Sequence, residues 1–416
     1  MATVKPFKGL RPPKEIAAKL ACLPYDVMNS TEAAQMADGK ECSLLHITRA
    51  EIDCPEGTDI HSEKVYDKAV RNFRHFQEKG WLVQDAGPKF YIYAQTMNGR
   101  TQYGIVGAAS CEDYHNGIIK KHELTRPDKE EDRMVLTRYL GANIEPVFFS
   151  YKAVPEIDEI VSNIVNAEKA EYDFVAEDGF GHHFWPVNDP EVNRKIEELF
   201  ATKVPATYVA DGHHRTAAAA RIGLEKKAQN PHHTGTEPYN YFMAVHFPDN
   251  QLQIIDYNRV VKDLNGMTAD ELLEKLTVSF EVEKTGADIY KPSRLHEFSM
   301  YLSGMWYKLT ARKGTYNDND PIGVLDVTIL SNLVLADLLG IQDLRTSKRI
   351  DFIGGIRGLG ELKKRVDGGE MKVAFALYPV SMKQLIDIAD SGNIMPPKTT
   401  WFEPKLRSGL VIYKFS

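Results

Sequence analysis

The chain is poor in cysteine, and the four cysteines it has are not arranged for metal binding. Cys22, Cys42, Cys54 and Cys111 lie in the first third of the 416 residues, and no two of them form a C-x-x-C pair. Zinc sites usually contain closely spaced cysteine pairs, and disulfide frameworks are typical of short, cysteine-rich secreted chains. We therefore expect four free thiols.

The sequence also lacks long apolar runs and an excess of positive charge. No segment has the ~18 apolar residues needed to cross a bilayer, and Met1 to Phe7 has no apolar signal core. The net charge of -7 and the pI near 6.0 argue against broad electrostatic binding to nucleic acid or anionic membranes. We find no internal repeat, heptad run or low-complexity tract. These absences predict a soluble, cytoplasmic protein with no membrane or nucleic-acid partner, and the sequence does not indicate its oligomeric state.

The composition that remains is that of an ordinary globular protein, large enough for two or three domains. Hydrophobic residues make up 43% of the chain and charged residues 26%. Strand-like and helix-like patterns alternate, which predicts a mixed α/β (α+β) fold. We expect an N-terminal α/β segment over residues 1–116, a core over 117–265 and a C-terminal α/β segment over 266–416.

Local patterns predict several individual elements. Apolar spacing indicates an amphipathic helix over 62–80, and Asn98-Gly99 between two strand-like runs indicates a hairpin. A second hairpin is expected around residues 248–250, and residues 43–47 are a candidate buried strand. In the last segment the patterns predict helices over 268–276, 326–339 and 381–390, a strand over 373–377 and an ordered extended loop over 395–405.

The most informative stretch runs from Tyr208 to Ala220, where an apolar run meets a helix-forming run. The strand should end at Asp211-Gly212, and Gly223 is placed to end the alanine-rich helix. Glycine permits a tight bend, and the first amides of a helix have no intrahelical partner. Such a turn is a natural site for an anion.

Three basic side chains crowd this helix start: His213, His214 and Arg215. The helix macrodipole disfavours cations at this end unless an anion lies among them. The structural alternative is that Asp211 is an N-cap, the histidines are solvated and Arg215 pairs with a neighbouring carboxylate. We favour the anion site for the set as a whole.

Two further polar stretches are candidates for the same site. Residues 120–133 contain His122-Glu123, whose carboxylate could instead be a solvated group paired with Lys120, Lys121 or Arg126. The loop at 395–405 contains lysines and threonines that could face an anionic ligand, and an ordinary surface loop is the alternative.

The strand, the Asp211-Gly212-His213-His214-Arg215 turn and the helix together resemble the signature of the ParB/sulfiredoxin superfamily, whose members bind nucleotide phosphates on this turn. His122-Glu123 matches a second motif of the free serine kinases in that superfamily. Over its whole length the chain resembles a large bacterial and archaeal family of unknown function, DUF1015. The residues that carry this wider likeness are Lys5-Pro6-Phe7, Pro24 to Val27, His122 to Thr125 with Asp132-Arg133, the Asp211 turn, and Pro397 to Thr400 with Phe402, Pro404 and Lys405.

The resemblance implies a ParB/sulfiredoxin-like nucleotide-binding core with a long connection between Glu123 and Asp211. Glu123 would be the catalytic base beside His122, and Mg²⁺ with ADP or ATP would be the cofactors, with Asp211 as a candidate metal ligand. The nucleotide phosphates would be held by Asp211, Gly212, His213, His214, Arg215 and Thr216. Candidate contacts to substrate or phosphate are Arg133, Lys398, Thr399, Thr400 and Lys405.

These residues favour an enzyme that transfers a phosphoryl group between a nucleotide and a small hydroxylated metabolite, with free L-serine or O-phosphoserine the leading candidate. A ParB-like, nucleotide-switched DNA-partition protein is one alternative. It would need a helix-turn-helix after the turn, whereas residues 239–261 predict strands. A non-catalytic nucleotide- or metabolite-binding protein is another alternative. A sulfiredoxin would need a cysteine in the turn, where this chain has His213 and His214.

Overall fold

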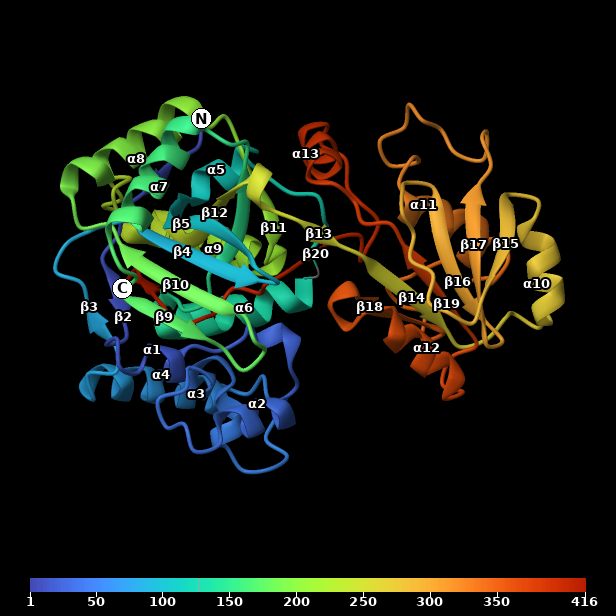
Figure 1. Cartoon of the computed structure of the whole chain (residues 1–416). Coiled ribbons are helices and arrows are strands. Elements are labelled where there is room, and N and C mark those ends of the chain that lie inside the picture. Colours follow the sequence, from blue (N-terminus) through green and yellow to red (C-terminus); the bar gives the residue numbers. More distant parts are fainter. Residues whose placement is uncertain (126) are drawn as a thin grey trace. The chain divides into compact units, whose positions relative to one another are not determined.

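The structure is a computed structural model that describes residues 1–125 and 127–416, with the side chains of residues 128 and 129 also left undescribed. The chain divides into two compact units (Figure 1). Unit 1 comprises Met1–Leu252 and Pro404–Ser416, and unit 2 comprises Gln253–Glu403. Residues 404–416 at the end of the chain therefore belong to the same unit as the N-terminus.

Unit 1 is built on a nine-stranded sheet with the order β6-β11-β8-β12-β5-β4-β10-β9, and β1 pairs with β5. The three segments predicted from the sequence do not coincide with the two units, because this one sheet takes strands from both of the first two segments. The strands are β1 (Val4–Lys5), β4 (Tyr91–Met97), β5 (Arg100–Ser110), β6 (Ile119–Lys120), β8 (Val147–Tyr151), β9 (Tyr172–Val175), β10 (Gly181–Pro186), β11 (Thr207–Asp211) and β12 (Tyr241–Pro248).

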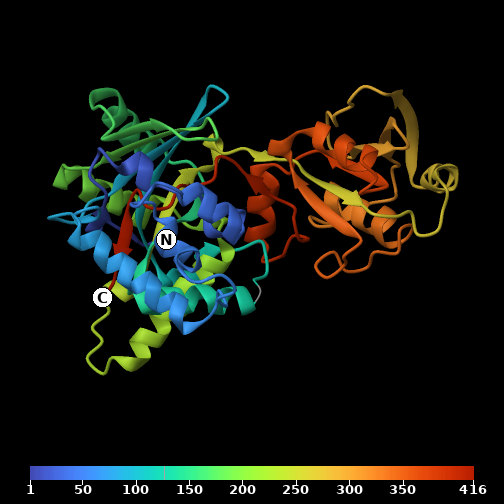
Figure 2. The same cartoon turned by 90° about the horizontal axis from the view of Figure 1, so that it is seen from below.

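Helices and a small second sheet complete unit 1. Helices α1 to α4 lie together on one side of the large sheet (Figure 1), and the end of α9 with the loop after it projects from the unit (Figure 2). The small sheet has the order β3-β2-β21-β7. The bounds are α1 (Ala17–Leu20), α2 (Ser30–Ala37), α3 (Leu45–Thr48), α4 (Glu63–Glu78), α5 (Cys111–His115), α6 (Pro127–Leu140), α7 (Pro155–Ala167), α8 (Pro190–Lys203), α9 (His213–Gln229), β2 (Gly9–Arg11), β3 (Val83–Gln84), β7 (Ala142–Asn143) and β21 (Ile412–Lys414).

Several local predictions are confirmed in unit 1. Helix α4 buries Val65, Ala69 and Phe73 on one stripe, as the helical spacing predicted. Strands β4 and β5 form the predicted hairpin, with Asn98 at φ 52° and Gly99 at φ 76°. Positive φ at both turn residues matches the right-handed twist of the paired strands, which is why Asn-Gly marks such turns.

Two predictions of strand structure are wrong. Residues 43–47 do not form a strand: residues 45–47 lie in the short helix α3, whose Leu45 and Ile47 pack in the core of the helical layer. A short apolar run does not distinguish a buried strand from a buried helix. The hairpin expected around residues 248–250 is absent, because β12 pairs with β5 and β8 while Ile254–Ile255 pairs with Trp401–Phe402 in unit 2.

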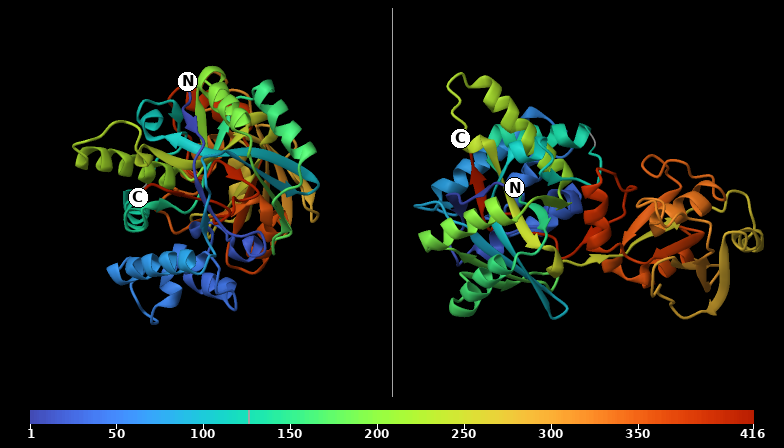
Figure 3. Two further views of the ribbon diagram at one scale, coloured as in Figure 1. Left: turned by 90° about the vertical axis from the view of Figure 1, so that its left-hand side faces the viewer. Right: turned by 90° about the horizontal axis from the view of Figure 1, so that it is seen from above.

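Gly223 does not end the helix as expected, since α9 continues to Gln229. A Cβ atom at Gly223 would lie 2.7 Å from the Cys111 sulfur and 2.9 Å from the Tyr239 carbonyl oxygen. The glycine therefore allows α9 to pack closely against its neighbours rather than stopping it. Figure 3 shows the long helix from two further directions.

Unit 2 contains a six-stranded sheet with the order β15-β17-β16-β19-β14-β18. The predicted helices near 268–276 and 381–390 and the strand at 373–377 are confirmed, and the helix predicted over 326–339 begins as α-helix and continues as π-helix at Ser331–Ala336. The bounds are β13 (Ile254–Ile255), β14 (Tyr257–Val261), β15 (Phe280–Gly286), β16 (Glu297–Leu302), β17 (Met305–Ala311), β18 (Ile350–Gly354), β19 (Val373–Leu377), β20 (Trp401–Phe402), α10 (Ala269–Leu276), α11 (Asp326–Leu330), α12 (Leu359–Asp367) and α13 (Met382–Asp390).

Two further findings concern the cysteines and the hydropathy of the helices. All four cysteines are free thiols, as predicted. Within residues 1–125 and 127–416, no helix combines the length and the hydropathy of a membrane span.

The packing around Gly223 leads to a stability prediction. We expect Gly223→Ala to lower the free energy of unfolding by about 1–2 kcal/mol, because overpacking at the Cys111 contact outweighs the better helix propensity of alanine. Urea unfolding measures this change. Gly360→Ala in α12 is the matched control, because its Cβ would meet no atom within 4 Å. That change should stabilise unit 2 by up to about 1 kcal/mol, and equal effects of the two substitutions would contradict the packing argument.

Candidate functional site

The predicted strand-turn-helix is present at Asp211. Strand β11 ends at Asp211, Gly212 has φ 90° and ψ 34°, and α9 begins at His213. This left-handed backbone favours glycine. Thr216 donates the first intrahelical hydrogen bond, from its amide to the Gly212 carbonyl at 2.9 Å, so the amides of residues 213–215 precede the helical ladder. Gly212 occupies the N-cap position, which removes the alternative that Asp211 is the cap.

Arg215 supports this turn from below. Its side chain is only 8% exposed, and its Nη1 donates a 2.6 Å hydrogen bond to the Pro146 carbonyl. The guanidinium lies 3.9 Å from the Asp211 carboxylate and folds under Gly212, where an added Cβ would meet Nη2 at 3.1 Å. The guanidinium, which the resemblance assigned to phosphate binding, is therefore buried beneath the turn.

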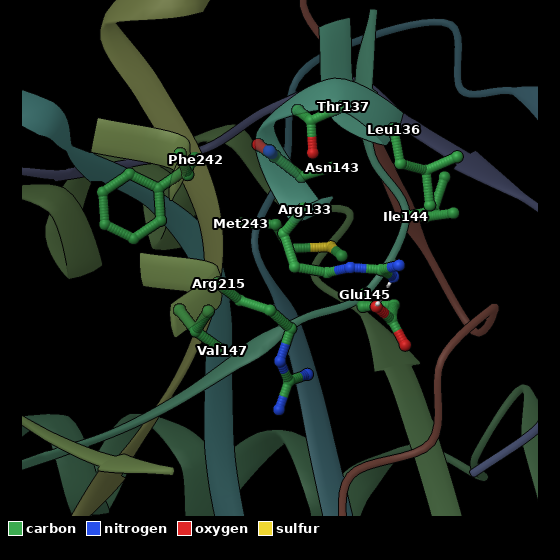
Figure 4. A pocket seen from close by; sticks show the side chains of 11 residues that line it. Arg133, Leu136, Thr137, Asn143, Ile144, Glu145, Val147, Arg215, Phe242 and Met243 are labelled. Carbon is green, nitrogen blue, oxygen red and sulfur yellow. Dashed lines mark ion pairs between the residues drawn. The ribbon is translucent and has the colours of Figure 1, made fainter. Parts of the chain in front are cut away.

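A small cavity lies beside the stem of Arg215 (Figure 4). Its walls include Arg133 and Glu145, whose ion pair has an Nη1 to Oε2 distance of 3.5 Å. The other oxygen of Glu145 accepts a 2.9 Å hydrogen bond from the Tyr25 amide, and the Arg133 guanidinium lies 3.8 Å from the centre of the Tyr25 ring. The cavity volume of about 30 Å³ admits a water-sized molecule and no metabolite. This region is therefore the packed base of the turn rather than a substrate pocket.

Asp211 is the ionised carboxylate of the turn. Burial alone would raise its pKa, but Lys405, Arg215 and His213 together lower the pKa to about 2. The Lys405 ammonium is 3.4 Å from the Asp211 carboxylate, whose side chain is 32% exposed. The turn thus combines one ionised acid with two adjacent cationic side chains, Lys405 and the buried Arg215.

His122 and Glu123 lie next to the turn, as the resemblance implied. Glu123 Oε2 is 4.0 Å from His213 Nδ1, and its side chain is 39% exposed. The ring of His122 meets the ring of His213 edge-on at 4.6 Å. The pairing of β6 with β11 explains this meeting: the strands are parallel, so the residues that follow them gather at one edge of the sheet.

Both of these imidazoles are neutral at pH 7. Burial lowers the pKa of His122 to about 4, against the opposing effects of Asp211 and the Val209 carbonyl. Burial and then the neighbouring His122 lower the pKa of His213 well below 6.5. His213 is therefore not an extra cation at the helix start, which removes part of the electrostatic mismatch inferred from the sequence.

The remaining predicted residues fall into both units. In unit 1, Lys405 reaches Asp211, and Thr216 is buried with its hydroxyl donating to the Gly212 carbonyl at 3.0 Å. In unit 2, the Lys398 carbonyl accepts a 2.9 Å hydrogen bond from Arg259, and the Thr399 hydroxyl donates to Pro396 at 2.6 Å. Thr400 follows them in the same loop of unit 2.

The alternatives considered for Glu123 can also be placed in part. Lys121 lies over the Tyr114 ring, with its Nζ 5.3 Å from the ring centre. Arg126, another partner considered for Glu123, lies outside the described residues. Among the residues that are described, no three His, Cys, Asp or Glu side chains form a group that could hold a metal ion.

Sequence reasoning gave no role to Tyr25, Asp26 and Glu145. Burial would lower the pKa of Arg215, but Asp26, Glu145 and Asp211 raise it above its usual value. The Pro24 to Val27 motif carried part of the family likeness, and this was the available signal for Tyr25 and Asp26. Glu145 had a weaker signal, an acidic residue two positions before a buried strand.

The fold and the site define a mixed α/β protein with a glycine turn at a helix N-terminus. Residues 4–328 match the family model described as "Protein of unknown function (DUF1015)", and the chain belongs to this family. It matches no curated protein sequence.

Solved structures give only distant likenesses. A free serine kinase in complex with AMP is 13% identical, covers 74% of this chain and 92% of its own, and has a TM-score of 0.34. SbnI with a C-terminal truncation from Staphylococcus aureus is 11% identical, with coverages of 73% and 87% and a TM-score of 0.38. A conserved hypothetical protein from Pyrococcus furiosus is 12% identical, with coverages of 74% and 95% and a TM-score of 0.34. Likenesses of this size transfer no activity to the chain.

The low pKa of His122 leads to a prediction about acid stability. In the unfolded chain this histidine takes up a proton below about pH 6.5, whereas in the folded protein it does so only near pH 4. The free energy of unfolding therefore falls as the pH is lowered from 6.5 to 4, and this residue does not change it above that window. His122→Gln should reduce the slope of unfolding free energy against pH between 6 and 5 by up to about 1.4 kcal/mol per pH unit. Urea unfolding at several pH values measures the slope. An unchanged slope in the variant would show that His122 is protonated in the folded protein.

Proposed function

We propose that unit 1 is a nucleotide-dependent phosphotransferase that acts on a small hydroxylated metabolite. The observation that carries this proposal is the meeting of Glu123 with the Asp211-Gly212 turn, across a long stretch of sequence, at the N-terminus of α9. Free L-serine or O-phosphoserine is the first candidate substrate, since His122-Glu123 and the turn resemble motifs of the free serine kinases.

The turn supplies the donors that a polyphosphate needs. The amides of residues 213–215 precede the helical ladder, the positive end of the helix dipole faces the same place, and the Lys405 ammonium is adjacent. The role of Arg215 is to support the turn, since its guanidinium is occupied by Pro146 and buried below Gly212. Phosphate would therefore be held chiefly by backbone amides and Lys405.

Glu123 is suited to the role of general base. Its carboxylate is partly exposed and lies beside a neutral imidazole, so it can reach a substrate hydroxyl. The substrate oxygen forms a bond to the terminal phosphorus of the nucleotide, the bond from that phosphorus to the bridging oxygen breaks, and the hydroxyl proton passes to Glu123 Oε2. The leaving nucleotide departs with one phosphoryl group fewer and takes up the negative charge.

The residues present fit a Mg²⁺ ion held jointly by the protein and the nucleotide. Magnesium is usually bound through one or two carboxylates plus substrate phosphates, and Asp211 offers an ionised, partly exposed carboxylate. When bound, the ion would neutralise charge on the transferring phosphoryl group. Asp211 is the residue of this chain that would hold it.

Two other functions are separated from this proposal by specific features. A ParB-like partition protein would carry a helix-turn-helix after the turn, whereas residues 239–261 form β12, β13, β14 and short 3₁₀ turns. A nucleotide sensor would bind in the same way but transfer nothing. The decisive experiment incubates the protein with Mg²⁺, ADP or ATP and a panel of hydroxylated amino acids, and follows new phosphomonoesters by phosphorus NMR. A new phosphomonoester supports the enzyme, and nucleotide binding without transfer supports the sensor.

The proposed base leads to a kinetic prediction. Glu123→Gln should lower turnover by about a hundredfold or more and leave the nucleotide dissociation constant nearly unchanged, because the amide keeps the shape of the side chain but cannot accept the proton. Glu112→Gln, at an exposed position on α5, is the control and should behave like the unsubstituted protein. Full activity in Glu123→Gln would remove this residue from the mechanism.

A further inference from the structure

Strand β4 carries three buried side chains that end in a hydroxyl or an amide and lie on one face: Tyr91, Tyr93 and Gln95. They alternate along the strand, so their side chains point to the same side of the sheet. Each side chain forms a hydrogen bond with the backbone of a segment from near one end of the chain. This face of β4 therefore fixes two segments that are far from it in sequence.

The Tyr91 hydroxyl binds the N-terminal part of the chain by accepting a 2.8 Å hydrogen bond from the Gly9 amide. Tyr93 and Gln95 bind the C-terminal residues 404–416. The Arg407 amide donates to the Tyr93 hydroxyl at 3.1 Å, and Gln95 Nε2 donates to the Lys405 carbonyl at 3.0 Å. Tyr93 and Gln95 are two residues apart on β4, and their partners Arg407 and Lys405 are also two residues apart. This equal spacing sets the register of residues 405–407 against β4.

Gln95 is itself held by a second amide. Gln102 is its direct partner across the β4-β5 hairpin, and Gln102 Nε2 donates to Gln95 Oε1 at 3.1 Å. The two glutamines are 0% and 3% exposed. Buried amides destabilise a sheet unless they are hydrogen-bonded, and apolar residues would fill the same space without this requirement. The pair is thus arranged to direct one amide donor at Lys405.

Lys405 is the residue whose ammonium lies 3.4 Å from the Asp211 carboxylate, and its side chain is only 12% exposed. The lysine side chain has a limited reach, and here it is largely buried, so the position of its backbone limits whether the ammonium can reach the turn. We propose that Gln95, oriented by Gln102, is a positioning residue that places Lys405 for phosphate binding at the Asp211 turn. This inference rests on the phosphate site proposed above and assigns to that site a hydrogen-bonded chain that begins on the β4-β5 hairpin.

A double-mutant cycle tests the inference. Gln95→Leu and Lys405→Ala are made singly and together, and the ADP dissociation constant is measured by calorimetry alongside turnover in the phosphorus NMR assay. We expect Gln95→Leu to weaken ADP binding or turnover by about 10- to 100-fold, as displacement of a binding group by about 1 Å does. The double variant should be no weaker than Lys405→Ala alone, because Gln95 acts through Lys405. Additive losses, or an effect of Gln95→Leu as small as that of the control, would overturn the proposal.

The control is Gln84→Leu, which also removes a glutamine-to-carbonyl hydrogen bond in unit 1 but at an exposed position, from Nε2 to the Lys8 carbonyl. If Gln95→Leu does not fold, Gln102→Met replaces it, since this change leaves Gln95 in place and removes only its orienting partner. Gln102→Met should then produce a smaller loss in the same direction, which again disappears in the Lys405→Ala background. Wild-type behaviour of Gln102→Met would count against the proposal.

A third measurement separates this inference from the proposed enzyme. Crystal structures of the unsubstituted protein, Gln95→Leu and the Gln84→Leu control need no ligand. The Lys405 ammonium, 3.4 Å from the Asp211 carboxylate here, should lie beyond ion-pair distance in Gln95→Leu and stay in place in Gln84→Leu. If the unsubstituted protein transfers no phosphoryl group, the proposed function fails while these structures still decide the positioning role. If the protein is active but Lys405 does not move in Gln95→Leu, the positioning role fails alone.

Discussion

The whole site depends on the parallel pairing of two short strands, β6 and β11. β6 has only two residues, and its partner β11 leads directly into the glycine turn. The pairing places the residues after both strands at one edge of the sheet, which is where parallel strands gather their functional side chains. Ile119 of β6 packs in the apolar cluster that also holds Val209 of β11, so burial fixes the register of this pair. The position of Glu123 beside His213 is a consequence of this register.

The second constraint is electrostatic, and the structure meets it by dividing charged and neutral groups between two layers. Below the turn, Arg215 and Arg133 are buried with Glu145, and burial is the largest influence on the pKa of all three. At the level of the turn, the imidazoles of His122 and His213 are held neutral. At this level Asp211, Lys405 and Glu123 carry charge. Buried ion pairs contribute little net stability, and the lower layer is better understood as a rigid support for the turn.

The sequence predicted those features that depend on local residues, such as the Asp211-Gly212 turn, helix α4 and the β4-β5 hairpin. It failed where long-range packing decides the outcome. Gly223 was read as a helix stop because propensity favours that reading, but the close approach of Cys111 determines its role. The direction of the Arg215 side chain could not be predicted either, since it depends on the carbonyl of Pro146, which lies in the loop directly before β8. Lys405 was predicted only as one of the lysines of the 395–405 loop and through the family likeness, because no local pattern connects that loop to residue 211.

The division into units explains why Lys405 needs side-chain anchors at all. Unit 2 occupies the sequence between Leu252 and Pro404, so the chain re-enters unit 1 one residue before Lys405. Regular strand pairing resumes only at β21, and before it the described backbone pairing of this segment is a single bridge between Ser408 and Cys22. A segment with so few ladder hydrogen bonds has a poorly specified register, and a slip of one residue would turn its side chains to the opposite side. The hydrogen bonds of Tyr93 and Gln95 to residues 407 and 405 fix the register of this segment. They can do so because β4 is itself held between β5 and β10 inside the large sheet.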